Sequence, residues 1–393
     1  MGKPVRRNRF FAAFAILITG LGWLTSVATQ ASPQQPGPTA AAVAAAVTGA
    51  PAEQVFKDIR VLKGIPADEF LDTMGMFASA LLFDCVSCHA KEIITDENAF
   101  ALETPKIQRA RQMIVMTNNI NRLYFGGQNR VTCFTCHGGG NFPRSEPNLD
   151  VQYGEPIEDP YAIAFVQSVA TAPATEIFAR YLKVIGGAEN AAKLTSFAGV
   201  GTYTGFDSND VPVPAEVFVR APNQMTTIAQ AQAGINAKVF DGRQGWRMQQ
   251  DTPIPLFVMT GDNLTGAAAE AMVWFPAALQ KSFSQWQTNV ASINGTNVLA
   301  VQGSNPGGQL PIRLYFDEES GMLVRMVHWR RTAVGAIPTR VDFEDFRPVA
   351  GVQMPFLWTR TWTNNQVVMQ MKEIRPNAQV EASRFARPQV TAR

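Results

Sequence analysis

The chain contains one short pattern twice, as "CVSCH" at residues 85–89 and as "CFTCH" at residues 133–137. These stretches contain all four cysteines and two of the three histidines among 393 residues. Two thiols separated by two residues can form thioether bonds to the vinyl groups of haem, and the adjacent histidine can then bind the iron. The pattern therefore predicts two covalent haem c groups, held by the following residues: Cys85, Cys88, Cys133 and Cys136 on the porphyrins, and His89 and His137 on the irons.

Three other uses of such cysteine pairs compete with haem attachment. A structural zinc ion takes four Cys or His ligands, whereas each stretch supplies three, so a shared ion would leave ligands over. A thioredoxin-like redox pair needs a single Cys-x-x-Cys at a strand-to-helix junction, and exported cysteines also form plain disulfides. The presence of two complete stretches favours haem over all three.

The sixth ligand of each iron has few sources. The remaining histidine, His328, lies in the β-rich half and could serve at most one haem, whereas fourteen methionines are available. Met74 lies on the apolar stripe of a predicted helix just before the first stretch, and Met76 falls off that stripe. Before the second stretch, Met113 and Met116 share a helix face, and spacing alone does not choose between them. In the absence of haem, such methionines would simply be core residues.

Residues 55–140 have a helical pattern and are predicted to form the haem-binding domain. One helix is predicted over residues 64–83 and a second over residues 104–125. Large apolar side chains recur at helical spacing in the first of these, and they should form its buried stripe. The stripe consists of Phe70, Leu71, Met74, Phe77, Ala78, Leu81 and Leu82.

From residue 173 to residue 393 the chain changes character. A helix over residues 174–187 is followed by alternating, aromatic-rich segments with turn signals between them, which predicts an antiparallel meander. A helical insert is predicted over residues 264–283. The predicted strand segments are residues 197–205, 215–222, 235–242, 245–250, 313–317, 322–329, 341–346 and 366–374.

The N-terminus has the layout of a secretory signal: basic residues, then an uncharged apolar run, then small residues ending at Ala28. We therefore expect a signal peptide at residues 1–28, or an uncleaved membrane anchor, with the rest of the chain periplasmic or extracellular. A Pro/Ala-rich linker is expected over residues 29–54 and an irregular connecting segment over residues 141–172. The net charge of +2 and the lack of a basic stripe give no case for nucleic-acid binding.

Four stretches resemble the cytochrome c subunit of photosynthetic reaction centres: "FLDTM", "CVSCH", "ARQMIVMTNNIN" and "VTCFTCHGG". In that family the methionine ligand comes from the helix that precedes each attachment motif. The resemblance therefore implies Met74 for the first iron and Met113, rather than Met116, for the second. The well-known members hold further haems and place a histidine ligand where this chain reads "INRLYFGGQ". The resemblance thus implies a dihaem relative that could serve respiratory transfer.

A second resemblance concerns residues 173–393. It is carried by the stretches "VIGGAENAAKLTSFAGVGTYTG" and "RLYFDEESGMLVR". These stretches are similar to the periplasmic lipoprotein-carrier (LolA-like) fold, which is a curved antiparallel sheet around a helical plug. Such a half-barrel could enclose an apolar ligand, and no motif in it supplies catalytic chemistry. The expected fold class is therefore multidomain α + β, with a mostly helical cytochrome domain followed by a LolA-like half-barrel.

The combined expectation is an exported dihaem cytochrome that carries electrons and is not an enzyme. Its partners would be a redox protein or quinol donor and an acceptor. Ligation by His and Met leaves no open position on either iron, which suits electron transfer. The alternatives are a two-haem periplasmic enzyme, either a peroxidase or a quinol oxidoreductase, and a lipid- or quinone-binding module with a redox domain attached.

Overall fold

The computed structural model describes residues 40–143, 145–146, 161–231, 234–250, 252 and 254–390. The predicted signal peptide lies outside these residues, as do the first part of the predicted linker and much of the predicted connecting segment. No helix within the described ranges combines the length and the hydropathy that a bilayer-crossing helix needs.

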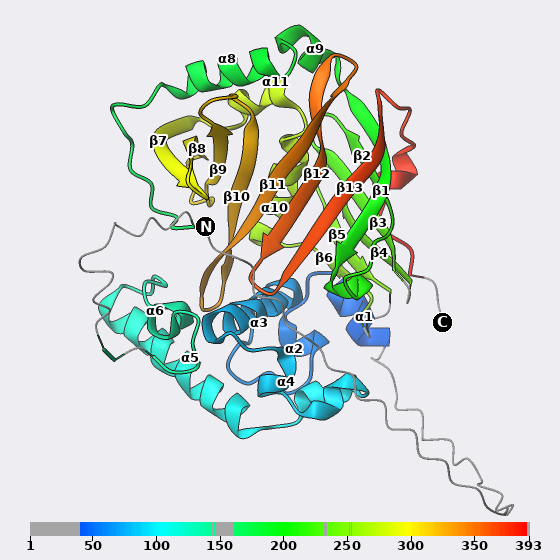
Figure 1. Ribbon diagram of the computed structural model, residues 1–393. Helices are drawn as coiled ribbons and strands as arrows, with labels where there is room; N and C mark the ends of the chain where they lie inside the picture. The colour runs from blue at the N-terminus through cyan, green and yellow to red at the C-terminus, as the bar shows by residue number, and fades with distance from the viewer. Residues whose placement is uncertain are drawn as a thin grey trace, which may run out of the picture. The chain divides into compact units, whose positions relative to one another are not determined.

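The N-terminal region is helical, as its periodicity predicted (Figure 1). Thr104 caps the longest helix, because its Oγ1 accepts a hydrogen bond from the Ile107 amide, and Gly126 follows it in the left-handed region, with φ 59°. The helices of this region are α1 (Ala40–Ala46), α2 (Ala52–Val55), α3 (Ala67–Leu81), α4 (Cys85–Cys88), α5 (Pro105–Tyr124) and α6 (Cys133–His137), with 3-10 turns η1 (Lys91–Ile94) and η2 (Glu97–Ala101).

A 13-stranded antiparallel sheet follows, which confirms the predicted half-barrel class. Its order is β6-β5-β4-β3-β2-β1-β13-β12-β11-β10-β9-β8-β7, so two meanders meet where β1 pairs with β13, and β6 and β7 are the edges. The strands are β1 (Ser196–Gly205), β2 (Val213–Arg220), β3 (Gln224–Ala231), β4 (Gly234–Phe240), β5 (Gly245–Gln249), β6 (Leu256–Val258), β7 (Gln285–Ile293), β8 (Thr296–Ser304), β9 (Ile312–Asp317), β10 (Leu323–Thr332), β11 (Gly335–Val349), β12 (Val352–Trp362) and β13 (Asn365–Pro376).

One helix fills the curve of this sheet. Helix α10 (Gly261–Met272) contacts β10 and also β3 and β4, which lie far along the strand order, so the sheet must curve around it (Figure 1). Gly266 permits this approach, because a Cβ at that position would lie 2.5 Å from Cε1 of His328 on β10. The remaining helices of this half are α8 (Ala174–Val184), α9 (Ala188–Lys193) and α11 (Pro276–Leu279), with 3-10 turns η3 (Phe206–Ser208), η4 (Gln280–Ser282) and η5 (Ala382–Phe385).

The structure differs from the sequence pattern in the face that α3 buries. The apolar stripe was expected to be the buried face, but its members remain partly or fully exposed, and Leu82 is 76% exposed. The opposite side is buried instead, and it includes Asp68 and Asp72 at 1% and 6% exposure, together with Met76 at 4%. The physical reason is that this side packs against β10, β11 and β6 of the sheet.

Candidate functional site

The first Cys-x-x-Cys-His stretch forms one short helical turn. Asp84 caps α4, because its carboxylate accepts hydrogen bonds from the amide of Ser87, at 2.8 Å, and from its hydroxyl, at 2.5 Å. The amide of His89 donates to the carbonyl of Cys85 at 2.9 Å. Residues three apart in a helix lie on one face, so the thiols of Cys85 and Cys88 can approach the same edge of a porphyrin.

The second stretch is built in the same way on α6. Thr132 and Thr135 form a capping box at its start, and Gly138 ends it in the left-handed region, with φ 56°. The reversed chain then lets the amide of Gly139 donate to the carbonyl of Ala80 at 3.0 Å. This hydrogen bond connects the second stretch to α3, which is the helix that precedes the first stretch.

Both histidines are oriented by backbone carbonyls. Nδ1 of His89 lies 3.1 Å from the carbonyl oxygen of Phe100, and Nδ1 of His137 lies 3.1 Å from that of Gly140. A carbonyl can only accept, so Nδ1 must carry the proton in both rings. In a neutral imidazole that is protonated at Nδ1, the Nε2 lone pair is free to bind a metal, and this is the usual arrangement of a metal-binding histidine.

Burial favours the uncharged forms of three residues of the two stretches, His89, Cys88 and Cys133. Burial lowers the pKa of His89, and the hydrogen bond to Phe100 opposes this only in part. A neutral imidazole is the form that binds iron. Burial also raises the pKa of the Cys88 thiol and raises that of Cys133 to about 11, so neither thiol resembles the low-pKa nucleophile of a redox pair.

Exposed apolar side chains are frequent in the segment that contains the two stretches. Of the eighteen large hydrophobic side chains that are exposed among the described residues, eleven lie between residues 82 and 142. Exposed apolar side chains rarely concentrate in this way unless something covers them. They are Leu82, Ile94, Phe100, Leu102, Val115, Met116, Leu123, Tyr124, Phe125, Phe134 and Phe142.

The candidate methionines differ in their surroundings. Met74 and Met113 are partly exposed, and Met116 is 43% exposed. Met76 is 4% exposed, and its Cε lies 2.8 Å from the place that a Cβ would take at Gly335 of β11. Its thioether is therefore committed to packing against the sheet.

His328 lies in a different environment from the other two histidines. It is 3% exposed on β10, and its Nε2 lies 3.0 Å from Oε1 of Glu270 on α10. This places its ring in the interior of the half-barrel. Within the described part of the chain, no three His, Cys, Asp or Glu side chains gather as a metal ion requires.

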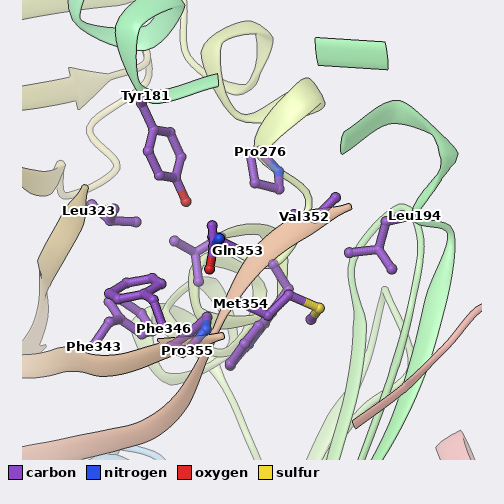
Figure 2. A pocket seen from close by; sticks show the side chains of 12 residues that line it. Tyr181, Leu194, Pro276, Leu323, Phe343, Phe346, Val352, Gln353, Met354 and Pro355 are labelled. Atoms are coloured by element: carbon purple, nitrogen blue, oxygen red, sulfur yellow. The ribbon is translucent and has the colours of Figure 1, made fainter. Parts of the chain in front are cut away.

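The half-barrel contains a pocket whose lining residues the sequence did not indicate. Figure 2 shows the hydroxyl end of Tyr181 directed toward Gln353, with the rings of Phe343 and Phe346 beside them. Burial raises the pKa of Tyr181, so its hydroxyl stays neutral. The pocket is lined by Tyr181, Leu194, Val273, Trp274, Pro276, Leu323, Phe343, Phe346, Val352, Gln353, Met354 and Pro355. Its residues come from helices and strands far apart in the chain, so no local pattern could have indicated it.

Residues 19–162 match the family described as photosynthetic reaction centre cytochrome C subunit. The match includes both Cys-x-x-Cys-His stretches and confirms the resemblance noted in the sequence. The N-terminal region is therefore similar to a cytochrome c subunit, and this similarity suggests electron transfer with c-type haem as the cofactor.

The sheet has LolA-like neighbours among solved structures. A LolA superfamily protein from Nitrosomonas europaea is 11% identical, with a TM-score of 0.36 over 55% of this chain and 99% of its own. A DUF1329 family protein from Desulfovibrio piger is 6% identical, with a TM-score of 0.38 over 55% of this chain and 98% of its own.

Proposed function

We propose that the protein is an exported two-haem electron carrier. The observation that carries the proposal is the matched construction of the two stretches. Each places a pair of cysteines on one turn and a histidine whose Nδ1 donates to a backbone carbonyl, beside exposed apolar side chains. Bound haem would supply a one-electron couple at each iron.

The chain's own residues would hold each haem in three ways. The cysteines would anchor the porphyrin edge, the oriented histidine would present Nε2 to the iron, and the exposed apolar side chains would exclude water from the ring. We assign the sixth positions to Met74 and Met113. The partial exposure of Met74 supports the first assignment, because Met76 is 4% exposed and its Cε lies against Gly335 of the sheet. The family resemblance supports the second.

Replacement of Met74 by leucine tests the assignment. We expect one haem to lose its thioether ligand, so that its reduction potential falls, while the other haem keeps its potential, because a thioether raises the potential. A redox titration followed by optical spectra measures both haems. Met76→Leu is the matched control on the same helix and should leave both potentials in place.

Met113→Leu and Met116→Leu, compared by the same redox titration and optical spectra, show which of the two methionines binds the second iron. If neither Met74→Leu nor Met113→Leu changes a spectrum or a potential, the ligand assignment is wrong. A high-spin iron that reacts with peroxide in the unmodified protein would favour the enzyme alternative over the carrier.

We further propose that the half-barrel binds an apolar molecule in the pocket of Figure 2. The pocket is lined almost entirely by aromatic and aliphatic side chains, as sites for apolar ligands are, but its free volume is only about 30 Å³, so an apolar molecule could enter only if these side chains moved apart. For the electron donor we propose a redox protein or a quinol, and for the electron acceptor a second redox protein.

Gln353→Trp should fill this pocket. We expect solvent extraction and mass spectrometry of the purified full-length protein to recover an apolar molecule, and the Gln353→Trp variant to lose it. Gln366→Trp, at an exposed position outside the pocket, should retain it. Equal recovery from both variants, or none from the unmodified protein, would count against the pocket as a binding site.

A further inference from the structure

Helix α3 is joined to the inside of the half-barrel by buried polar contacts. Asp68 accepts hydrogen bonds from the amide and the hydroxyl of Thr260, both at 2.7 Å. Asn263 on α10 donates to Asp68 at 3.1 Å and to Asp72 at 2.6 Å. These bonds connect α3 to residues more than 190 positions later in the sequence.

The ion pair between Asp72 and Arg330 is the most buried contact of this junction. Nη1 of Arg330 lies 2.6 Å from Asp72 Oδ1 and 2.8 Å from Asn263 Oδ1, and the two side chains are 3% and 6% exposed. Nε and Nη2 of Arg330 have no hydrogen-bond partner among the described residues. The orientation of the guanidinium therefore depends on α3 and Asn263.

Two hairpins of the sheet rest on the same helix. Gly75 allows the turn after β12 to approach, because a Cβ there would lie 2.7 Å from Oγ1 of Thr363. At the other hairpin, a Cβ at Gly335 would lie 2.8 Å from Cε of Met76 on α3, and 2.7 Å from Cγ2 of Thr132, the residue that caps the second Cys-x-x-Cys-His stretch. Packing alone could let α3 slide, whereas the buried ion pair permits one register.

We propose that Arg330 is a positioning residue for the haem held by the first stretch. It acts through Asp72, which lies two residues before Met74 on α3, and so sets where the Met74 thioether stands relative to His89. This inference rests on the proposed function, in which Met74 binds that iron. It assigns to the half-barrel a role in setting a reduction potential.

A buried ion pair adds little net stability, but removal of one partner leaves an uncompensated charge, so α3 would shift to relieve it. A metal–ligand bond tolerates much less displacement than a packed apolar contact, because supporting contacts must hold a ligand within about 0.5 Å. Loss of Arg330 should therefore affect the iron–thioether bond before it unfolds the chain.

The test uses the full-length, haem-loaded protein with Arg330→Met, Arg330→Lys and a control. Arg331→Met is that control, since Arg331 is the next residue on β10 but is 57% exposed and pairs with Asp262 at 2.7 Å. We expect Arg330→Met to weaken the absorption of the ferric iron–thioether bond and to lower the potential of one haem. Arg330→Lys should restore part of both changes, and Arg331→Met should change neither.

Hydrogen exchange provides a readout that does not depend on the iron. In Arg330→Met, the amides of α3 should exchange roughly a hundredfold faster, while those of β10 and β11 keep their protection. If Arg330→Met fails to fold, Asn263→Ala removes the bridge to both aspartates and should give the same pattern. Unchanged potential and spectrum in a folded Arg330→Met or Asn263→Ala variant would overturn the inference.

Met74→Leu, measured beside these variants, separates this inference from the proposed function. If Met74→Leu changes one haem and Arg330→Met changes none, the ligand assignment stands and the positioning role fails. If Met74→Leu changes nothing, the assignment itself fails, and the positioning role fails with it.

Discussion

A variant in which Cys133 and Cys136 are both alanine should carry one haem instead of two. The thiols of α6 would be the covalent anchors of the second haem, so their removal should halve the amount of covalently bound haem. The haem attached to Cys85 and Cys88 should remain. The expected result is a loss of one haem in intact mass, measured after denaturation in detergent, from protein made in cells with a working haem-ligation pathway.

The converse variant, with alanine at Cys85 and Cys88, is the matched control and should also retain one haem. In both, the uncovered apolar side chains near the altered stretch should increase the binding of a hydrophobic dye. An unmodified protein that contains no covalent haem would contradict the proposed function entirely. A single haem in the unmodified protein would contradict only the count of two.

Replacement of Glu270 by glutamine should cause the largest loss of stability in the half-barrel. Glu270, 7% exposed on α10, lies 2.6 Å from Nζ of Lys238, 2.9 Å from Nε of Arg360 and 3.0 Å from Nε2 of His328. Loss of its charge would leave two partly buried cations, Lys238 and Arg360, without their carboxylate. Removal of one partner from a buried ion pair typically costs about 3–5 kcal/mol, and we expect a loss of this order in the free energy of unfolding, measured with urea.

The pH dependence of that loss follows from the pKa of Glu270. Burial alone would raise this pKa, but Arg360, Lys238 and His328 together hold it well below its ordinary value of 4.5. A lowered pKa contributes stability that is present above pH 4.5 and is lost as the pH falls toward the folded value. The difference between the unmodified protein and Glu270→Gln should therefore shrink below pH 4.5.

A surface pair serves as the control for this experiment. Glu189 is paired with Lys193 at 2.7 Å, but its side chain is 85% exposed. Glu189→Gln should change the free energy of unfolding by no more than about 0.5 kcal/mol, because water screens such pairs. Equal effects of Glu189→Gln and Glu270→Gln would show that the buried charges do not hold the half-barrel together.

Local chemistry was readable from the sequence, because it depends on neighbours in the chain. The two Cys-x-x-Cys-His stretches, the helix starting at Pro105 and the alternating strands all follow from spacings of two to four residues. Five strands were not predicted: β3, β6, β7, β8 and β12. Several of these are rich in Gln, Asn and Thr or are very short, so their pairing is decided by the strands beside them rather than by their own apolar pattern.

The face that α3 buries was decided only by the tertiary structure. By itself, the sequence determined that α3 is a helix with an apolar stripe, and this pattern places Asp68 and Asp72 on its polar side. Arg330, which makes burial of Asp72 tolerable, lies 258 positions away, and Asn263 lies 191 positions away. Helical periodicity reports which residues share a face. It does not report whether that face meets water, a porphyrin or a buried cation, since the partner comes from a distant part of the chain.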